Sequence, residues 1–574
     1  MRQLHAGEGV ISNLPREHGQ LPKGVQPGYI TEVTNDDETT AMAAVTVAEM
    51  DELEPTYEEA CMRSDWPQWE KAIDVELQSL KVAGTWEVVE RPDGVNVVDS
   101  KWVFRLKKDA KGNIIKWKAQ LVARGFTQVY GVDYFETFAP VARLASVRFI
   151  LAIAARNNWD IVMFDFHSTY LNGILDDNET IYMEQPPHHE VANCSHYIVK
   201  LRKSLYGLKQ ASRKWYDTLC NSLVDIGFQR SMADPVVFYA HIGNNVVVLF
   251  IHVDDAMIMG SSALLINNFK QHIEEQFDIT NLGPISWLLG LAITCNHTKQ
   301  TLSLSQESYI DSLLCHFNLE DAKSITAPMD SNTCLTIDDC PTSVKDKLKM
   351  KRVPYREAVG ALNWLAVGTQ PDIAFTVGQL AQFMENPGRV HWEAAKRVMR
   401  YLKGTKELKL TYGESERCGL EGYLDVDGAT QDHRRAISGF IVFVDRGAVS
   451  WSSKKQELVM LSTMEAEYVG VTHAAKELIW FQRLTGEIFQ LLTYPIVLYL
   501  DNQSAIALAN SEGQFHAHTK HIDIRYHFIK FCVQNDSITL IYCPTEDMIA
   551  DILTKPLPVI KTKYFTHDLS LIMV

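Results

Sequence analysis

The stretch VVVLFIHVDDAMIM, residues 246–259, decides how the first half of the chain folds. Its two apolar runs, Val246–Val253 and Ala256–Met259, are separated only by Asp254 and Asp255, a pattern typical of a β-hairpin. Adjacent carboxylates repel each other and lose hydration beside apolar strands. A hairpin therefore carries them at its turn mainly when a divalent cation neutralises them. The simpler alternative for a lone Asp-Asp pair is a solvated turn.

A further acid is expected on a neighbouring strand. Asp165 closes the apolar run Ile161–Phe164. Asp165 and Asp254 on adjacent strands can hold two Mg²⁺ ions roughly 3.5–4 Å apart. Such a pair of ions deprotonates an attacking hydroxyl and supports the leaving oxygen in phosphoryl transfer, so the hairpin predicts that chemistry.

Composition and periodicity divide the chain into segments. We expect a flexible acidic tail at 1–55, a strand-and-helix unit at 56–330, a polar linker followed by helices at 331–415, an alternating α/β unit at 416–560 and a C-terminal tail at 561–574. The predicted helices are Tyr57–Leu80, Val141–Arg156, Trp215–Ile226, Tyr355–Thr405 with two breaks, Glu465–Leu484, Ser504–Asn510 and Asp547–Leu553. The predicted strands outside the hairpin are Trp86–Val89, Lys101–Leu106, Gly439–Val444, Ile496–Leu500 and Ile538–Tyr542.

The charge distribution reverses what the total charge suggests. The net charge of −16 over 574 residues argues against a nucleic-acid partner. Residues 1–60, however, hold twelve acidic and three basic side chains, whereas residues 101–124 hold eight basic side chains and one acid. Residues 200–214 hold six basic side chains and no acid. With interleaved Trp and Tyr, these two runs predict phosphate contact and base stacking, against the alternative of solvated surfaces.

The cysteines and apolar runs indicate the cellular environment. Ten cysteines are scattered without a CxxC pair, which favours free thiols in a reducing compartment. The longest apolar runs are far shorter than the roughly 20 residues of a membrane helix, and the N-terminus lacks a signal-peptide pattern. We therefore expect a cytoplasmic protein without a membrane partner.

Four further acids stand on separate elements of the second α/β unit. Asp425 follows the strand Gly422–Leu424, Glu467 lies at a helix entry, and Asp501 ends the strand at 496–500. Asp551 lies in the last predicted helix. Carboxylates that converge in this way can hold two Mg²⁺ ions that activate water against a phosphodiester. Each acid alone is more simply a surface charge or a helix cap. Asp427 and Glu465 are the alternatives for the first two positions.

Ordered motifs connect the two acid sets. They are KWVF at 101–104, KAQLVARGF at 118–126, ETFAPVA at 136–142, YLNG at 170–173, SLYGLKQA at 204–211, VDD at 253–255, WSSKKQ at 451–456, DNQSA at 501–505 and KHIDIR at 520–525. In this order and spacing they resemble the reverse transcriptase and ribonuclease H region of Ty1/copia-type retrotransposon Pol polyproteins. The resemblance runs from about Tyr57 to the C-terminal region.

The resemblance implies an α+β right-hand polymerase fold, with fingers, palm and a helical thumb-like connection, followed by an α/β ribonuclease H-like domain. It implies an RNA-directed DNA polymerase, a nucleotidyltransferase, with linked ribonuclease H activity and two Mg²⁺ ions per active site, or Mn²⁺ in their place. The expected partners are RNA template, DNA primer, RNA–DNA hybrid and deoxynucleoside triphosphates. The expected location is the cytoplasm, including virus-like particles, with access to the nucleus. The oligomeric state stays open.

The resemblance also assigns roles to individual residues. The catalytic residues it implies are Asp165, Asp254, Asp255, Asp425, Glu467, Asp501 and Asp551, of which all except Asp255 are also expected metal ligands. The nucleotide-binding residues are Lys118, Tyr170 and Gln210, with Tyr170 as the aromatic that blocks a ribose 2′-hydroxyl. The expected nucleic-acid contacts are Lys101, Arg105, Lys107, Lys108, Arg124, Lys203, Lys209 and Arg213.

Some positions depart from the family pattern and leave an alternative function open. The departures are Gln120 for Arg, His252 for Tyr, the run Phe166–Thr169 with His167 and a bulkier Thr169, Gln370 for Arg and Gly428 for Trp. The alternative is a degenerate, catalytically weak or inactive copy that retains nucleic-acid binding. The histidines at 516, 518, 521 and 527 lack cysteine or carboxylate partners at ligand spacing, so they favour partial positive charge near nucleic acid over a metal tract.

Overall fold

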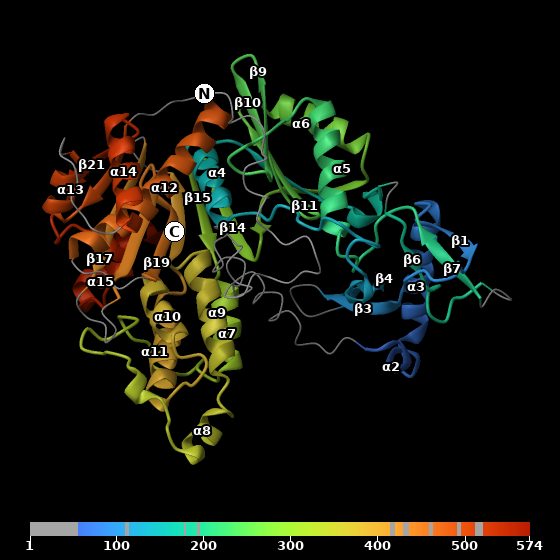
Figure 1. Ribbon diagram of the computed structural model, residues 1–574, viewed down its shortest axis with the longest axis horizontal. Helices are drawn as coiled ribbons and strands as arrows, with labels where there is room; N and C mark the ends of the chain where they lie inside the picture. Colours follow the sequence, from blue (N-terminus) through green and yellow to red (C-terminus); the bar gives the residue numbers. More distant parts are fainter. Residues whose placement is uncertain are drawn as a thin grey trace.

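The structure is a computed structural model that describes residues 55–108, 114–176, 179–191, 196–413, 419–428, 435–457, 463–490, 495–510 and 520–574. The side chains of residues 107, 108, 463 and 520–524 lie outside this description, as do residues 1–54 of the expected acidic tail. Figure 1 shows four packed regions: a blue finger region, a green and cyan region beside it, a yellow helical region and an orange-to-red C-terminal region.

The finger region builds its core from two helices and two small sheets. Its elements are α2 Tyr57–Cys61, α3 Trp66–Val82, β1 Trp86–Glu90, β2 Val97–Val98, β6 Tyr182–Met183 and β7 Tyr197–Leu201, with a separate two-stranded hairpin of β3 Ser100–Lys108 and β4 Ile114–Ala123. We call β3 and β4 the finger hairpin. The single helix predicted at 57–80 is two helices, α2 and α3. Pro67 lies in the first turn of α3, where the backbone N–H that proline lacks would have no partner within the helix.

The hairpin predicted at 246–259 lies at the centre of a six-stranded sheet, the palm sheet. Its order is β12 Ile279–Pro284, β5 Ile161–Phe166, β11 Asp255–Gly260, β10 Asn245–His252, β9 Val237–Ile242 and β8 Gln229–Arg230. Strand alternation sends Phe164 and Leu249 toward α5 Ala211–Ile226 and α6 Ala263–Glu274, and sends Met163 and Met257 toward α4 Leu144–Arg156. Two short 3₁₀ helices, η1 Gly125–Thr127 and η2 Thr169–Asn172, complete this region.

A third sheet and a helical region follow the palm. The sheet has the order β13 Trp287–Leu288, β14 Leu291–Asn296, β15 Thr301–Ser305, β16 Lys409–Gly413 and β22 Leu571–Ile572. The helical elements are α7 Glu307–His316, η3 Ile337–Asp339, α8 Val344–Met350, α9 Tyr355–Gly368, η4 Pro371–Ile373, α10 Ala374–Ala381 and α11 Arg389–Thr405. The stretch read as a polar linker thus contains η3 and α8. The expected C-terminal tail at 561–574 contains most of the helix Val559–Asp568 and the strand β22. Strand β22 pairs with β16, and its residue Leu571 is buried there.

The C-terminal sheet has the order β19 Gly447–Lys455, β18 Ile437–Val444, β17 Leu420–Asp427, β20 Ile496–Leu500 and β21 Ile538–Tyr542. The pairs among β17, β18 and β19 are antiparallel, whereas β20 runs parallel to both β17 and β21. The helical elements around it are α12 Thr463–Phe489, α13 Gln503–Asn510, α14 Lys520–Gln534, η5 Ile549–Leu553 and α15 Val559–Asp568. The last predicted helix, at 547–553, is therefore the 3₁₀ helix η5.

One hydrophobic core joins the palm to the C-terminal region. It contains α4, the palm residues that face it, and residues of β18, β19 and α12. Arg148 of α4 is 2% exposed and donates to the backbone carbonyls of Val449, Val367 and Gly368. Figure 1 shows α4 between the palm strands and the orange C-terminal strands. The predicted fold class, a right-hand polymerase fold followed by an α/β domain with ribonuclease H-like strand order, is confirmed.

Candidate active sites

The three palm acids meet at one end of the palm sheet. Asp165 of β5 lies directly opposite Asp255 of β11 in the antiparallel register, so their side chains leave the same face. Asp254 stands in the turn just before Asp255, and its carbonyl accepts the N–H of Phe166 at 2.8 Å. The turn is Val253–Asp254 instead of the predicted Asp254–Asp255, since Asp255 already pairs with His252 as the first residue of β11.

An aromatic cluster beneath the turn holds it in place. Val253 has a left-handed backbone with φ of 58°, which is costly for a β-branched residue. The indole N–H of Trp215 donates to the Val253 carbonyl at 2.7 Å, and the Trp215 ring packs edge-on against Phe166. Because Trp215 belongs to α5, the position of the turn is coupled to the helix that covers the sheet.

Tyr170 lies on η2 with its ring held on two sides. The ring packs edge-on against Tyr206 with centroids 4.9 Å apart, and the Tyr170 hydroxyl accepts a hydrogen bond from Ser212 at 3.3 Å. Burial raises the pKa of Tyr206 well above its usual range, and the charges of Asp254 and Asp165 raise it further. Tyr206 therefore connects Tyr170 to the palm acids.

His167 and Thr169, which depart from the family pattern, both form hydrogen bonds with neighbouring residues. His167 bonds through Nδ1 to Asp278 at 2.9 Å and through Nε2 to Thr280 of β12 at 2.5 Å. Thr169 is buried and donates to the carbonyl of Phe166 at 3.1 Å. The side chain of Thr169 therefore packs inward against the start of η2.

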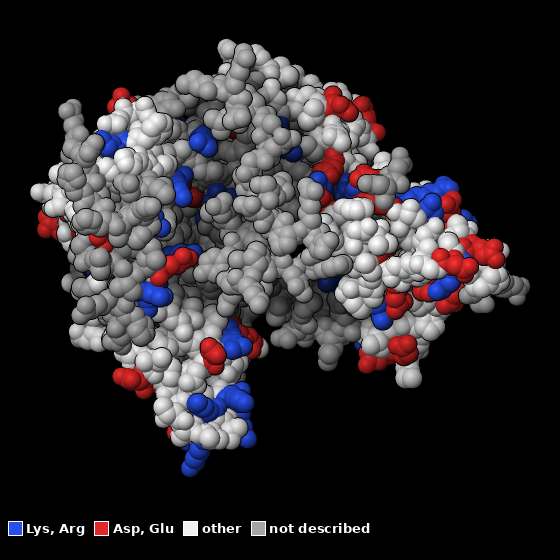
Figure 2. Space-filling view, in the orientation of Figure 1, with Lys and Arg blue, Asp and Glu red and all other residues white. Residues whose placement is uncertain are grey.

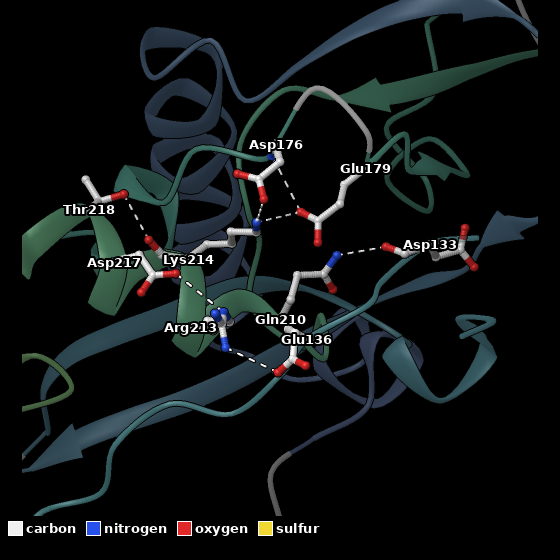
Figure 3. Close-up of polar contacts among 9 residues, drawn as sticks. All are labelled: Asp133, Glu136, Asp176, Glu179, Gln210, Arg213, Lys214, Asp217 and Thr218. Atoms are coloured by element: carbon white, nitrogen blue, oxygen red, sulfur yellow. Dashed lines mark hydrogen bonds and ion pairs between the residues drawn. The ribbon is translucent and has the colours of Figure 1, made fainter. Parts of the chain in front are cut away.

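Gln210 and the basic residues that follow it are held by acids and carbonyls from distant segments, as Figure 3 shows. Gln210 is fully buried and donates to the carbonyl of Asp133 at 2.8 Å. Lys214 lies 2.6 Å from Asp176 and 2.9 Å from Glu179, and Arg213 lies 3.3 Å from Glu136. The predicted role of Gln210 in nucleotide binding would therefore require it to exchange these bonds.

The charge count over residues 200–214 overstates the free positive charge. Arg202 forms an ion pair with Glu87, and Lys209 donates to the hydroxyl of Tyr134 at 3.1 Å while its ammonium lies over that ring. Together with the ion pairs of Arg213 and Lys214, these contacts occupy most of the basic side chains of residues 200–214. The partners come from other parts of the sequence, so a count along the chain does not include them. Figure 2 likewise shows basic and acidic side chains intermixed over the finger region.

The finger hairpin presents a basic face. The register places Arg105 opposite Lys118 and Lys101 opposite Val122, so these cations share one face of the two strands. Residues of the other face, such as Phe104 and Leu121, are buried in the finger core with α3. Arg124 at the end of the hairpin is paired with Asp99 at 3.1 Å. The side chains of the predicted contacts 107 and 108 lie outside the described residues.

Two glycines lock the finger hairpin to the strand-to-helix segment before α5. A Cβ on Gly207, whose φ is 88°, would lie 2.1 Å from the Ala123 carbonyl oxygen, and a Cβ on Gly125 would lie 2.2 Å from that of Gly207. The Ala123 N–H donates to the Tyr206 carbonyl at 2.8 Å. This close backbone approach sets the hairpin's basic face relative to Tyr206, and thus to the palm acids.

A second basic surface appears where the sequence predicted a polar linker. Five cations surround α8, namely Lys345, Lys347, Lys349, Lys351 and Arg352. Figure 2 shows this group as blue side chains on the projecting tip at the bottom of the view. Asp346 is the acid within this run, and it pairs with Lys349 at 3.1 Å. An alternation of Lys with other residues over 345–351 was the signal available in the sequence.

Three of the four acids of the second set line a pocket beside β17 and β20, and Asp551 does not line it. Asp425 lies within β17 instead of closing a shorter strand, and Glu467 lies near the start of α12, after its first turn. Asp501 follows β20, and Asp551 lies in η5. The pocket measures about 520 Å³ and is lined by Asp425, Val426, Asp427, Glu467, Asp501, Asn502, Gln503, Tyr542 and Lys555. Glu467 and Asp425 therefore open onto it, with Asp427 also on its wall, while Glu465 does not line it.

Burial and mutual repulsion perturb the acids of this pocket. Burial raises the pKa of Glu467 to about 8, and the charges of Asp425 and Asp501 add to the rise. Burial also raises the pKa of Asp425 to about 6, although Lys555 acts against the shift. Buried acids of like charge at one pocket are a mark of a functional site.

The residues of this pocket fit a divalent cation. Glu467 Oε2 is buried without a hydrogen-bond partner, and the acids around it destabilise one another, which are conditions that a bound cation would relieve. No group of three His, Cys, Asp or Glu side chains in the described ranges is already gathered in a metal-ligand arrangement. Asp425, Glu467 and Asp501 are the residues that would hold the ion.

Two lysines that the sequence did not single out complete the site. Lys555 lies 2.7 Å from Asp551 Oδ1 and 3.5 Å from Asp425 Oδ2, and Lys561 lies 2.7 Å from Asp551 Oδ2. The spacing of four residues between Asp551 and Lys555 was the available signal. Of the histidine tract, residues 516 and 518 and the side chain of 521 lie outside the described residues.

A palm sheet with an acidic hairpin, followed by a five-stranded mixed sheet with buried acids, defines the class of reverse transcriptases joined to a ribonuclease H-like domain. Residues 83–331 match the family described as reverse transcriptase (RNA-dependent DNA polymerase). The chain belongs to the Pol polyproteins of Ty1/copia-type retrotransposons.

Two relatives carry that assignment. The chain is 41% identical over 511 residues to the retrovirus-related Pol polyprotein from transposon TNT 1-94 of Nicotiana tabacum, covering 88% of this chain and 38% of that protein. It is 37% identical over 492 residues to the Pol polyprotein from transposon RE1 of Arabidopsis thaliana, covering 85% of this chain and 33% of that protein. The chain thus spans about a third of the length of these relatives.

A solved structure of the foamy viral protease–reverse transcriptase in complex with double-stranded DNA is similar at a TM-score of 0.43 and 11% identity, covering 83% of this chain and 70% of that chain. No helix in the described ranges is long and apolar enough to cross a membrane.

Proposed function

We propose that the chain is an RNA-directed DNA polymerase whose C-terminal region hydrolyses RNA in RNA–DNA hybrids. The observation that carries the proposal is the pairing of Asp165 with Asp255 beside Asp254, on a sheet with a basic finger hairpin next to it. The separate pocket of Asp425, Glu467 and Asp501 supports the second activity. The substrates that follow are RNA template, DNA primer and deoxynucleoside triphosphates at the palm, and RNA–DNA hybrid at the C-terminal pocket.

The palm residues divide the work of polymerisation. The register of β5 and β11 arranges the acids before substrate binds, and Trp215 fixes the turn that carries Asp254. Divalent cations, Mg²⁺ or Mn²⁺, would supply charge stabilisation at the reacting phosphate when Asp165 and Asp254 bind them. Lys101, Arg105 and Lys118 present positive charge for the phosphates of nucleotide and template.

Tyr170 has the rigidity that sugar selection requires. Its ring is packed against Tyr206 and its hydroxyl is bonded to Ser212, so it cannot rotate away without losing both contacts. A fixed aromatic wall beside the acids would clash with a ribose 2′-hydroxyl and leave space for a deoxyribose. This supports the preference for deoxynucleotides.

The C-terminal pocket would orient water and a phosphodiester. Glu467 and Asp425 open onto the pocket, and the raised pKa of Glu467, about 8, lets its carboxyl hold a proton near neutral pH in the absence of a cation. When a cation binds at the pocket that proton must leave, because Glu467 can hold the ion only as a carboxylate.

The test is a pair of reciprocal substitutions on the purified full chain. Asp254→Asn should lower RNA-templated primer extension roughly 100-fold or more and leave hybrid cleavage intact. Asp501→Asn should do the opposite. Asp278→Asn is the matched control. Asp278 is an exposed acid at the same end of the palm sheet, and among the described side-chain contacts it bonds only to His167.

The same assay decides against the alternative of an inactive copy. If the wild-type chain extends no primer with Mg²⁺ or Mn²⁺ but still binds duplex in a salt-sensitive manner, the polymerase proposal fails and the nucleic-acid-binding copy remains. If Asp254→Asn and Asp278→Asn lower extension equally, the assignment of Asp254 is wrong.

A further inference from the structure

The fourth acid of the C-terminal site differs from the other three. Asp551 is 0% exposed, and each of its two carboxylate oxygens lies 2.7 Å from a lysine ammonium. A buried carboxylate held by two charge-assisted contacts is stable without any added cation. Asp551 thus has a lysine ammonium against each oxygen, whereas Glu467 Oε2 is buried without a hydrogen-bond partner.

The two lysines do not occupy equivalent places. Lys555 lines the pocket and also lies 3.5 Å from Asp425 Oδ2, so it is shared by two of the four acids. Lys561 turns away from the pocket: it donates to the Thr545 carbonyl at 3.0 Å and its ammonium lies 5.0 Å from the centre of the Phe565 ring. Only the Lys555 charge therefore lies on the side of Asp551 that faces the other acids.

The surrounding contacts hold Lys555 and its acids in one arrangement. The Lys555 N–H donates to the Asp551 carbonyl at 3.2 Å, which continues the turn of η5. The neighbouring Thr554 hydroxyl donates to Asp425 Oδ2, the same oxygen that Lys555 approaches. Lys555 thus stands on a segment that is tied both to β17 and to η5.

We propose that Lys555 is a positioning residue of the hydrolytic site, an internal counter-ion that holds Asp551 against Asp425 and competes with the divalent cation for them. This inference rests on the proposed ribonuclease H function of the same pocket. While the ammonium bridges the two acids, a cation that binds there must weaken the contact of Lys555 with Asp425. Lys555 thereby lowers the affinity of the site for the cation. When no cation is bound, Lys555 keeps Asp551 and Asp425 together.

The cost of binding a cation beside a fixed positive charge is large over short distances. Charges this close interact strongly, because the effective dielectric at a protein surface is well below that of bulk water. Removing the Lys555 charge should therefore tighten cation binding by about tenfold or more, even after solvent screening. Lys561 is separated from the pocket by Asp551, so removing its charge should have a much smaller effect on binding.

The experiment titrates MnCl₂ into the full chain by calorimetry in an Asp165→Asn, Asp254→Asn background, so that the palm acids contribute little. Lys555→Met is expected to lower the dissociation constant about tenfold or more, whereas Lys561→Met and Lys555→Arg should stay close to the background protein. Glu467→Gln identifies the binding that belongs to the pocket, because it should abolish that part of the signal.

Thermal unfolding without metal gives the second readout. Lys555→Met should lower the unfolding temperature in EDTA, and MnCl₂ should restore more of it than in the background protein, since the ion then replaces the missing charge. Lys555→Arg, which keeps the charge, maintains the test if Lys555→Met does not fold, because it should preserve both the EDTA stability and the dissociation constant.

The outcomes separate this inference from the proposed function. If Lys555→Met binds Mn²⁺ no more tightly than the background protein, or if Lys561→Met tightens binding equally, the counter-ion role is wrong. If Glu467→Gln leaves the Mn²⁺ binding of the background protein unchanged, the pocket binds no ion and the inference also fails. Cleavage of hybrid by the wild-type chain is measured separately and reports on the proposed function.

Discussion

Asp372, at the start of the helical region, shows how burial controls a single ionisable group. It lies in η4, is 2% exposed, and accepts a hydrogen bond from the Tyr401 hydroxyl at 2.5 Å on one oxygen, while its other oxygen has no hydrogen-bond partner. Burial raises the pKa of Asp372 to about 6, against the lowering effect of the Tyr401 bond. Its charged form is therefore disfavoured in the folded protein.

This shift predicts a pH dependence of stability. The folded pKa is about 6 and the ordinary value is 3.8, so the folded state holds a proton that the unfolded state has released between those values. The stabilisation is complete below about pH 4 and is lost as the pH rises through 6. The loss is about 3 kcal/mol, equivalent to roughly two pKa units.

The measurement compares wild type with Asp372→Asn, which keeps an acceptor for Tyr401 but cannot titrate. Denaturant unfolding at pH 4, 5, 6 and 7 should show the variant gaining roughly 2 kcal/mol relative to wild type across the series. A difference between the two proteins that stays constant with pH would contradict the raised pKa of Asp372.

The sequence could predict which palm acids lie together but not which acids pair with the basic residues. Asp165 and Asp255 follow from a hairpin and an adjacent apolar strand, because strand pairing has simple geometric rules. The partners of Arg213 and Lys214 lie 77 and 38 residues away, so a linear charge count made those cations look free. Lys555 was missed because its role arises from the meeting of η5 with β17.

At the scale of elements, α4 is the helix on which the arrangement of sheets depends. Every residue from Leu144 to Ala155 is buried, which is unusual for a helix on one face of a sheet and indicates partners on both sides. One side packs on the palm sheet and the other on β18 and β19. The apolar sequence LASVRFILAIAAR carried this signal, although we predicted only a helix from it.

Other elements show where the sequence was insufficient. Pro67 marked the start of α3, yet the apolar spacing ran through it and suggested one helix. Strand β22 has only two residues, which is too short for a periodic pattern, and its existence depends on β16 lying beside it. Long apolar strands such as β10 were predicted well, because hydrophobic content alone determines that they are buried.

Arg148 provides a prediction for α4. Replacing Arg148 by Met keeps the volume but leaves the carbonyls of Val449, Val367 and Gly368 without their donor, so the chain should lose roughly 2–5 kcal/mol of stability. Arg156→Met on the same helix is the control. Its side chain is 42% exposed and pairs with Asp445 at 3.5 Å, so its loss should cost at most about 1 kcal/mol.

Thermal unfolding of the two variants, followed by circular dichroism, checks this difference. Extension and hybrid cleavage should both decline for Arg148→Met at temperatures where wild type is stable, because α4 supports both regions. Equal unfolding temperatures for Arg148→Met and Arg156→Met would show that Arg148 does not hold the sheets together.

At the scale of the whole molecule, the palm and the C-terminal region behave as one packing unit. The shared core includes the contact of Phe149 with Phe481, 5.3 Å between ring centroids, and Arg143 lies over the Trp480 ring while pairing with Glu477. Trp480 also donates to the Ala233 carbonyl at 2.8 Å. The finger core is a separate cluster built around α3.

This division predicts the pattern of hydrogen exchange. Amides of α4 and α12 should open with the same free energy, because neither can lose its core contacts without exposing the other. Amides of α3 should open with a different free energy. Native-state exchange read by mass spectrometry measures all three, and a lower opening free energy for α12 than for α4 would contradict a single unit.

The contact between α4 and α12 has a consequence for synthesis on the ribosome. Arg143 and Glu477 are 334 residues apart, so α4 leaves the exit tunnel long before its partner exists. At about 5–20 residues per second, the interval is roughly 20–70 s. Throughout that time the apolar residues of α4 that face α12 have no intramolecular cover. Nascent chains of this protein should therefore be strong clients for ribosome-associated chaperones.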